Sequence, residues 1–467
     1  MRKRHKSKSF PQLTIIDTAA KGKTVAKTAE GIPIFLNEGV PGDVVDIRTY
    51  KKRKGFFEGR VERYHQKSED RTSPACEHFD LCGGCKWQHM QYPAQLKYKQ
   101  KEVSENLKRI GGIIPADNLD ILGNNTPYFY RNKMEFSFSS NRWMTQEEID
   151  SGKEFNKNAL GFHKPGMWDK IVDIEKCHLQ PDPSNAIRNE IRAYAIKKEL
   201  TFFHPREQSG FLRTLMIRTT STAEVMVLLQ VVHESPELFP LLDHIKTTFP
   251  EITSLLYVIN NKANDTLYDQ DIILYAGRDY IVEEMEGLQF KIGAKTFYQT
   301  NSLQAYELYK ITRDFAQLKK EDVVYDLYTG IGTIAQFIAK SVTKVVGVDV
   351  VPESIAAAKV NAAENKIDNA FFEAGDMKAL FTEDFIARHG KANVVITDPP
   401  RDGMHKDVIH QLLSLSPERI VYVSCNSATQ ARDLALLKAT YKVIKSQAVD
   451  MFPQTHHVEN VVLLEKI

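Results

Sequence analysis

The sequence has few cysteines and tryptophans and no long hydrophobic run. Its 467 residues include 5 Cys and 3 Trp, and no apolar stretch approaches the ~18 uninterrupted residues of a membrane-spanning helix. The basic start, residues 1–10, is followed only by the apolar segment LTII, which is too short for the apolar region of a secretory signal. We therefore expect a cytoplasmic protein with no membrane partner, a compartment in which disulfides are disfavoured.

Strong overall charge is also absent, but the charge is unevenly distributed. The net charge is +2, yet residues 1–64 contain 15 Lys and Arg against 7 Asp and Glu, which leaves about −6 for the rest. The segment 50–60 interleaves its basic residues with Tyr50, Phe56 and Phe57. Cations attract phosphates and aromatic rings stack on bases, so the N-terminal part is predicted to bind nucleic acid.

The length predicts two or three domains, and the patterns divide the chain accordingly. After a basic tail at 1–10, short alternating strands predict a small OB-like barrel at 11–65. Residues 66–285 are expected to form an α+β middle domain, although a helix at 94–112 could pack on the C-terminal domain. Residues 286–467 alternate strands with helices, which is typical of an α/β, doubly wound sheet.

A glycine-rich turn follows the first strand of this last domain. Gly330-Ile-Gly332-Thr333-Ile-Ala335, with Asp349 at the end of the next strand, satisfies the dinucleotide fingerprint, so a nicotinamide oxidoreductase is one interpretation. Asp326, four residues before Gly330, creates D-x-x-x-G-x-G, which resembles the cofactor motif of S-adenosylmethionine-dependent methyltransferases. Asp376, which is expected to close the third strand, resembles the next contact of that family, on the adenine side of the cofactor.

Two further strands end in residues suited to chemistry. Asp398 begins DPPRDG after the fourth strand, and Cys425 ends the apolar run IVYVSC before a helix. Because the carboxyl ends of parallel strands meet at one edge, both side chains are expected to face the cofactor crevice. A free cysteine can also be a small core residue, and an Asp-Pro-Pro segment can be an ordinary turn.

The motifs together resemble the RNA uracil-C5 methyltransferases. The resemblance rests on DPPRDG (398–403), VSCN (423–426), THHVE (455–459) and FYQTN (297–301), around DLYTGIG. It extends over essentially the whole chain, and residues 11–64 resemble the TRAM RNA-binding barrel of the ribosomal-RNA branch. It implies a class I methyltransferase domain preceded by a TRAM barrel and a middle domain.

The resemblance also implies a mechanism. The thiolate of Cys425 would add to C6 of uracil, C5 would take the methyl group, and Glu459 would remove the C5 proton. Asp398 is expected to hold the uracil edge, and the helix after Cys425 is expected to lower the thiol pKa. His456 and His457 are alternative bases with orienting roles favoured, and Phe297 is a candidate for base stacking. The S-adenosylmethionine contacts implied are Gln299, Tyr328, Gly330, Gly332, Thr333, Asp349, Asp376 and Asp398.

The four other cysteines form a set. Cys76, Cys82 and Cys85 are spaced C-x5-C-x2-C, and Cys177 lies far downstream. Four thiolates suit zinc or an iron–sulfur cluster, and nearby histidines (His78, His89 and His178) leave a mixed zinc site open. The family resemblance implies a [4Fe–4S] cluster on the four cysteines, which we expect to be structural.

RNA is the expected partner, and no protein partner is inferred. A stacked uridine does not expose C5 and C6, so the target should be flipped or unpaired. The resemblance favours 23S ribosomal RNA, with transfer RNA as the alternative. A non-catalytic RNA-binding protein is the remaining interpretation.

Overall fold

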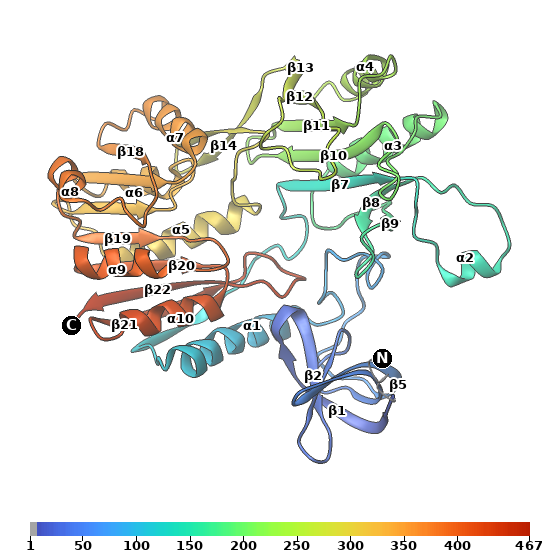
Figure 1. Cartoon of the computed structure of the whole chain (residues 1–467), viewed down its shortest axis with the longest axis horizontal. Helices are drawn as coiled ribbons and strands as arrows, with labels where there is room; N and C mark the ends of the chain where they lie inside the picture. Colours follow the sequence, from blue (N-terminus) through green and yellow to red (C-terminus); the bar gives the residue numbers. More distant parts are fainter. Residues whose placement is uncertain (1–6) are drawn as a thin grey trace.

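The computed structural model describes residues 7–467, and within them three β-sheets and a barrel account for the strands (Figure 1). Residues 1–6, most of the expected basic tail, lie outside the described residues, and β1 already begins at Ser9. No helix in 7–467 combines the length and the apolar character needed to cross a membrane.

The N-terminal strands close into a barrel, as expected. The order around it is β1-β2-β3-β5-β4, and β3 and β5 pair in parallel while the other contacts are antiparallel. Alternate residues such as Ile15, Ile34 and Ile47 are fully buried inside it. The strands are β1 (Ser9–Ala19), β2 (Lys23–Lys27), β3 (Pro33–Leu36), β4 (Val44–Arg53) and β5 (Phe56–Gln66).

The middle part of the chain contains a seven-stranded sheet in the order β13-β12-β11-β10-β7-β8-β9. Two helices, α3 (Ser184–Lys197) and α4 (Leu238–Thr248), cover one face, where aromatic and aliphatic side chains form a core. The strands are β7 (Lys133–Ser139), β8 (Ala159–His163), β9 (Ile171–Asp173), β10 (Leu212–Thr219), β11 (Val225–Val231), β12 (Ile252–Ile259) and β13 (Ile273–Gly277). The short helix α2 (Gln146–Asp150) precedes β8, and a hairpin of β14 (Tyr280–Met285) and β15 (Leu288–Gly293) follows β13.

The C-terminal part forms an eight-stranded sheet in the order β18-β17-β16-β19-β20-β22-β21-β6. The strand order changes direction between β16 and β19, whose carboxyl ends border the crevice where open α/β sheets bind ligands. The strands are β16 (Val323–Leu327), β17 (Lys344–Asp349), β18 (Ala370–Ala374), β19 (Val394–Thr397), β20 (Arg419–Ser424), β21 (Tyr441–Val449) and β22 (Glu459–Lys466).

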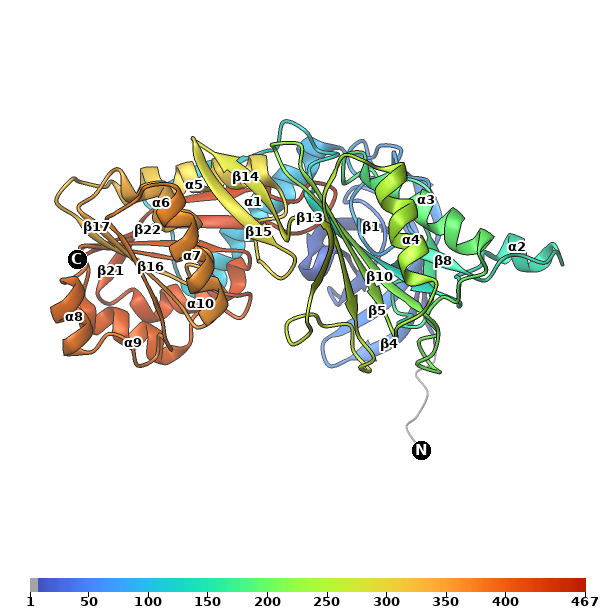
Figure 2. The same ribbon diagram turned by 90° about the horizontal axis from the view of Figure 1, so that it is seen from above.

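Helices lie on both faces of this sheet (Figure 2). Their apolar residues form two cores, one on each face, which hold the strand ends in fixed positions. One face carries α5 (Ser302–Ala316), α6 (Thr333–Ala339) and α7 (Pro352–Glu364), and the other carries α8 (Glu383–His389), α9 (Lys406–Leu415) and α10 (Ser427–Leu437).

One segment of the expected middle domain belongs to the C-terminal sheet. Helix α1 (Tyr92–Asn106), extended by a π-helical turn at Leu107–Gly111, packs beside α10, and β6 (Asp117–Leu122) pairs in parallel with β21. The interpretation of 66–285 as one middle unit therefore does not hold for this segment. In Figure 1, α1 lies between the barrel and the C-terminal sheet. It thus brings the barrel close to the edge of the sheet where β20 ends and β22 begins.

Candidate active site and cysteine pocket

Cys425 and Glu459 lie at the ends of two paired strands. Cys425 directly follows β20, and Glu459 is the first residue of β22. The antiparallel register sets Ser424 opposite Asn460, so the next positions in the same register are Cys425 and Glu459. Asp398 directly follows β19, which is the parallel neighbour of β20. Three residues that are far apart in the sequence are therefore brought to one edge of the sheet.

Burial dominates the titration of these groups. It raises the pKa of Cys425 to about 11, and the negative charges of Glu459 and Asp398 add to the effect. It likewise raises the pKa of Glu459 to about 8 and that of Asp398 to about 7. The expectation of a lowered thiol pKa is thus wrong for this state of the protein, because burial and two carboxylates outweigh the helix that follows Cys425.

The side chains of these three residues form no hydrogen bond or ion pair with other groups of residues 7–467. Glu459 is only 5% exposed, whereas Cys425 and Asp398 are partly exposed. Buried polar groups normally find partners within the protein or in a ligand. The positive charge of Arg401 compensates in part, since it lowers the pKa of both Cys425 and Glu459. These observations are consistent with a site that receives its polar partners from a bound ligand.

The turn after β20 is joined to the Asp-Pro-Pro segment. The Nδ2 atom of Asn426 donates to the carbonyl of Arg401 at 3.0 Å, and the Oγ1 atom of Thr429 donates to the same carbonyl at 3.1 Å. The side chain of Asn426 also caps α10 by accepting from the Ala428 amide. Because of this cap, α10 begins at Ser427, directly after the turn.

A cavity of about 560 Å³ opens beside Cys425. It lies where the barrel, α1 and the C-terminal loops meet, so residues from three distant segments of the chain line it. Glu459 and Asp398 are not among its lining residues. Three groups of residues form the lining. The barrel contributes Asp17–Lys21. Helix α1 and the turn after it contribute Tyr98, Lys101, Glu102, Glu105, Asn106 and Arg109, and the C-terminal part contributes Arg401, residues 425–428 and residues 456–458.

The glycine-rich turn has the geometry of a ligand-binding loop. Gly330 and Gly332 both have positive φ, +56° and +77°, and a Cβ built on Gly330 would meet no atom within 4 Å. The carboxylate of Asp349 accepts a hydrogen bond from the Gly330 amide at 2.9 Å. Asp326 closes the turn by accepting from Thr329 and from the Ala335 amide.

Asp326 has one oxygen left without a partner. Its Oδ1 atom is buried and unpaired, and burial, followed by the charges of Asp398 and Asp349, raises its pKa to about 7. Together with the open space at Gly330, this unpaired oxygen shows that the turn fits the cofactor expected there. Tyr328, which also has positive φ, follows β16 at the same edge.

The other expected cofactor residues differ in their position and in their burial. Thr333 is the first residue of α6 and is buried. Gln299 lies before α5, where its carbonyl accepts from Asn132. Asp376 is exposed and lies two residues past β18, so it follows the strand rather than ending it. Phe297 is 69% exposed and lines a different cavity, so the structure does not bring it to Cys425.

His456 and His457 form the wall of the cavity beside Cys425. Their ring centroids are 4.1 Å apart, and burial lowers the pKa of His456 to about 4 and that of His457 to about 3. Both imidazoles are therefore neutral near pH 7. A base with so low a pKa abstracts protons poorly, which favours the orienting role over the alternative of a histidine base.

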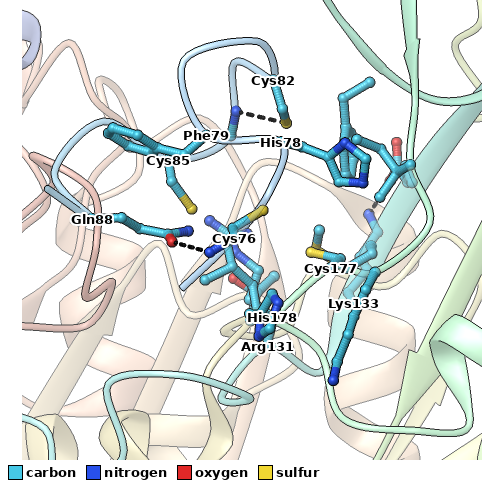
Figure 3. Close-up of a pocket in the computed structure, with 18 residues that line it drawn as sticks. Cys76, His78, Phe79, Cys82, Cys85, Gln88, Arg131, Lys133, Cys177 and His178 are labelled. Carbon is cyan, nitrogen blue, oxygen red and sulfur yellow. Dashed lines mark hydrogen bonds and ion pairs between the residues drawn. The ribbon is translucent and has the colours of Figure 1, made fainter. Parts of the chain in front are cut away.

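The four remaining cysteines line a second cavity, of about 340 Å³ (Figure 3). Cys76, Cys82 and Cys85 come from the segment before α1, and Cys177 comes from the segment before α3. The Gly84 amide donates to the Sγ atom of Cys82 at 3.3 Å. His78 and His178 also line the cavity, whereas His89 does not.

The chemistry of this donor set fits a metal centre. Burial raises the pKa of Cys82 and of Cys85 to about 12, and the charges of the neighbouring cysteines contribute to the increase. The thiols can therefore ionise together only if a positive centre lies between them. In 7–467 no three His, Cys, Asp or Glu side chains are close enough to hold a single metal ion.

Sequence reasoning missed the polar contacts that support the site. Lys99 and Asp450, both fully buried, form an ion pair of 2.6 Å, and Gln95 and Gln454 bond to each other. Nothing in a single sequence pairs residues some 350 positions apart. The one available signal was polarity: Gln95 and Lys99 lie one helical turn apart in the predicted helix, close to its apolar face.

Comparisons with known proteins cover almost the whole chain. The model of the tRNA (Uracil-5-)-methyltransferase family matches residues 268–467. An "Uncharacterized RNA methyltransferase" of Bacteroides thetaiotaomicron is 53% identical over 452 residues, 96% of this chain and 99% of the relative. Another, from Chlorobaculum tepidum, is 36% identical over 472 residues, 99% of this chain and 98% of the relative.

A solved structure is also similar to this chain over nearly its whole length. It is the Pyrococcus abyssi tRNA (uracil-54, C5)-methyltransferase in complex with S-adenosyl-L-homocysteine, which covers 97% of this chain and 99% of its own, with a TM-score of 0.75 and 26% identity. The likeness therefore includes the barrel and the middle sheet as well as the eight-stranded sheet.

Proposed function

This chain belongs to the RNA uracil-C5 methyltransferase family, and from that premise we propose that it methylates C5 of a specific uridine in RNA with Cys425 as nucleophile and Glu459 as base. The nicotinamide oxidoreductase interpretation is set aside, because the relatives and the matching structure are methyltransferases. S-adenosylmethionine is the cofactor, and when bound it supplies the methyl group.

The proposed reaction has three steps for the residues of this chain. The sulfur of Cys425 forms a bond to C6 of uracil, and the electron pair of the C5–C6 double bond moves toward O4 to give an enolate. C5 then gains the methyl group, which restores the C4 carbonyl. Glu459 removes the remaining proton from C5, and the returning electron pair expels the thiolate of Cys425. The base regains its starting state by losing that proton to solvent.

The pKa values support a particular order of proton movements. With pKa values of about 7 for Asp398, about 8 for Glu459 and about 11 for Cys425, the first negative charge resides on a carboxyl group. At neutral pH the thiol then loses its proton to solvent as the sulfur adds to C6, and the negative charge passes from sulfur to the uracil ring. The thiolate that is expelled in the last step takes a proton back from solvent. Asp398 is proposed to hold the uracil edge during this step and to contact the cofactor.

One observation carries the proposal: Cys425 and Glu459 share one strand register beside a cavity that the barrel also lines. A core cysteine would not need a cavity or a buried acid beside it. Lys21 and Arg401 line the same cavity, which supports entry of the RNA beside the barrel. A uridine flipped out of its stack could then reach the sulfur atom.

Large-subunit ribosomal RNA is our first candidate substrate, because residues 11–64 and the cysteine set resemble the ribosomal-RNA branch of the family. Transfer RNA is the second, and the specific observation in its favour is the full-length likeness to a tRNA (uracil-54, C5)-methyltransferase. Because that likeness includes the barrel, the presence of a barrel does not distinguish a ribosomal RNA substrate from a transfer RNA substrate. Mapping 5-methyluridine in both RNAs, with and without the gene, would distinguish them.

The cysteine pocket is proposed to hold a [4Fe–4S] cluster through Cys76, Cys82, Cys85 and Cys177. The donor set, the pocket that they share and the glycines beside Cys82 support this assignment. Such a cluster would supply a cross-link between the segment before α1 and the segment before α3. The methylation steps above require no electron transfer, so its proposed role is structural.

The test is incubation with RNA that contains 5-fluorouridine, together with S-adenosylmethionine. Fluorine cannot leave C5 as a proton does, so the methylated adduct should remain bonded to the protein. We expect a denaturation-resistant complex that maps to Cys425. Absence of an adduct with both ribosomal and transfer RNA, while each RNA still binds, would contradict the proposal and favour a non-catalytic RNA-binding protein.

A further inference from the structure

The catalytic base is held indirectly, through the loop that precedes it. Residues 450–458 connect β21 to β22, and Glu459 pairs with Val449 at the last position of that ladder. The carboxyl group of Glu459 is buried yet forms no hydrogen bond or ion pair with other groups of residues 7–467. The pairing with Val449 holds its backbone on one side, and on the other side the chain reaches it through the loop, whose last residues are His457 and Val458.

The segment after Cys85 holds this loop by its backbone. The amides of Lys86 and Trp87 both donate to the carbonyl oxygen of Gln454, each at 3.0 Å. Trp87 is 2% exposed, and its Nε1 atom donates to the carbonyl of Gly22 in the barrel at 3.4 Å. One short segment thus links the cysteine pocket, the barrel and the loop before Glu459.

Gln95 completes the connection from α1. Its side chain is fully buried, its Oε1 atom accepts from the Gln454 amide at 2.9 Å, and its Nε2 atom donates to the Gln454 Oε1 atom at 2.9 Å. The same Nε2 atom donates to the carbonyls of Trp87, at 3.0 Å, and Met90, at 2.9 Å. Gln95 therefore binds both Gln454 in the loop and Trp87 in the segment after Cys85, the two residues that also contact each other.

Neighbouring residues secure the start of the loop. The Nζ atom of Lys99 donates to Asp450 at 2.6 Å and to the carbonyl of Phe452 at 3.1 Å. The hydroxyl of Tyr130 donates to the carbonyl of Pro453 at 2.9 Å. The loop is thus held at successive positions by residues between 86 and 130.

We propose that Gln95 and Gln454 are positioning residues that set the location of Glu459 for proton abstraction, by tying its loop to the segment that follows Cys85. This inference rests on the proposed function. It also gives the cysteine pocket a specific role, because the segment after Cys85 is ordered where it can hold the loop before the catalytic base. Loss of the link should impair the last step of the reaction, removal of the C5 proton, more than the addition of Cys425 to C6.

The step-specific prediction can be measured with Gln95→Leu, which keeps the volume but removes every hydrogen bond of the side-chain amide. With ordinary uridine RNA, we expect kcat to fall at least tenfold, the Kd for RNA to change less than twofold, and a methylated covalent complex to accumulate. With 5-fluorouridine RNA, adduct formation requires no proton abstraction, so its rate should stay within about twofold of the parent protein.

A matched control is Gln180→Leu in the middle sheet, where a buried glutamine donates to the Ile217 carbonyl. That variant should show no accumulated complex, even if its stability falls as much as that of Gln95→Leu. Gln454→Ala serves as a second variant, because it removes the side-chain link but keeps the bonds to its carbonyl oxygen, and it should accumulate a smaller amount of the complex.

Two results would overturn the inference. One is an unchanged kcat in both variants, and the other is adduct formation with 5-fluorouridine RNA that slows as much as kcat does, because either shows that Glu459 is not selectively displaced. If the parent protein itself forms no adduct with 5-fluorouridine RNA, the proposed function fails, and that outcome is distinct from the other two.

Discussion

Cys425 and Glu459, 34 positions apart in the sequence, are neighbours because β20 and β22 pair with Ser424 opposite Asn460. The charge of Glu459 helps to raise the pKa of the Cys425 thiol, so the two groups are electrostatically coupled as well as adjacent. As the proposed nucleophile and base, the two groups are fixed on adjacent strands of one sheet and could act on opposite ends of the same C5–C6 bond. Their separation is then set by the strand ladder and not by a flexible loop alone.

Replacing the nucleophile should abolish the reaction without unfolding the protein. For Cys425→Ser we expect methyl transfer to fall by at least ~10³-fold, because a serine hydroxyl is a far poorer nucleophile for conjugate addition. Adduct formation with 5-fluorouridine RNA should disappear, while RNA affinity stays within about threefold. Methyl-transfer assays and gel shifts check both, and Ser427→Ala, two residues away, is a control that retains the thiol.

Replacing the base should trap the intermediate. Glu459→Gln keeps the side-chain shape but cannot accept the C5 proton, so a methylated protein–RNA complex should accumulate on ordinary RNA and turnover should fall by at least ~10²-fold. In the parent protein, the turnover limited by this step should rise with pH up to about 8, the pKa of Glu459, because the base must be ionised. A turnover that is independent of pH between 6 and 9 would argue against Glu459 as the base.

Asp398 should make the stability of the protein depend on pH. Burial raises its pKa from 3.8 to about 7, so the folded state binds the proton more tightly than the unfolded state does. The free energy of unfolding therefore falls as pH rises from about 4 to about 7. Asp398→Asn removes this contribution, so between pH 4 and pH 8 the stability of the variant relative to the parent protein should rise by about 4 kcal/mol. Urea unfolding at both pH values measures the shift.

Two glycines of the cofactor turn should respond differently to alanine. In Gly332→Ala the new Cβ would lie 2.6 Å from the Phe372 ring, so we expect a loss of about 2 to 3 kcal/mol in stability. In Gly330→Ala the Cβ meets open space, so only the left-handed φ costs energy, about 1 kcal/mol. Gly330→Ala should instead weaken S-adenosylmethionine binding, because its Cβ enters the space expected for the cofactor. Thermal unfolding and calorimetric titration separate the two effects.

The cysteine pocket can be tested by metal content. Protein prepared without oxygen should contain about four iron and four sulfide per chain, the composition of a [4Fe–4S] cluster. Cys82→Ser and Cys177→Ser should each lose the iron and its visible absorption. Cys425→Ser should keep both, and it is the matched control because it removes the one cysteine outside the pocket. One zinc per chain, with no sulfide, would show that the mononuclear alternative is correct.

The sequence predicted those features that local patterns encode. The closed barrel, the strand ends before Asp398 and Cys425, and the glycine turn before α6 all follow from alternation, turn residues and capping. Each of these depends on residues only a few positions apart, and a strand that ends in a polar turn carries this information in its own composition.

Other features depend on contacts between distant segments. The pKa of Cys425 was predicted in the wrong direction because helix position can be seen in the sequence, whereas burial and the proximity of Glu459 cannot. The role of α1 was only partly anticipated, since its ion pair between Lys99 and Asp450 joins residues 351 positions apart. Phe297 shows the same limit, because adjacency to a motif does not fix the direction of a side chain.

The parallel pairing of β6 with β21 has a consequence for how the protein is synthesised. Asp117–Leu122 leaves the ribosome more than 300 residues before its partner strand, Tyr441–Val449. The edge strand of the catalytic sheet must therefore wait, together with α1, until nearly the whole chain has emerged. A fragment that starts at residue 286 would lack this strand and expose the free edge of β21, which makes it prone to aggregate. The catalytic half is thus not an autonomous module that can be exchanged by recombination at the apparent domain boundary.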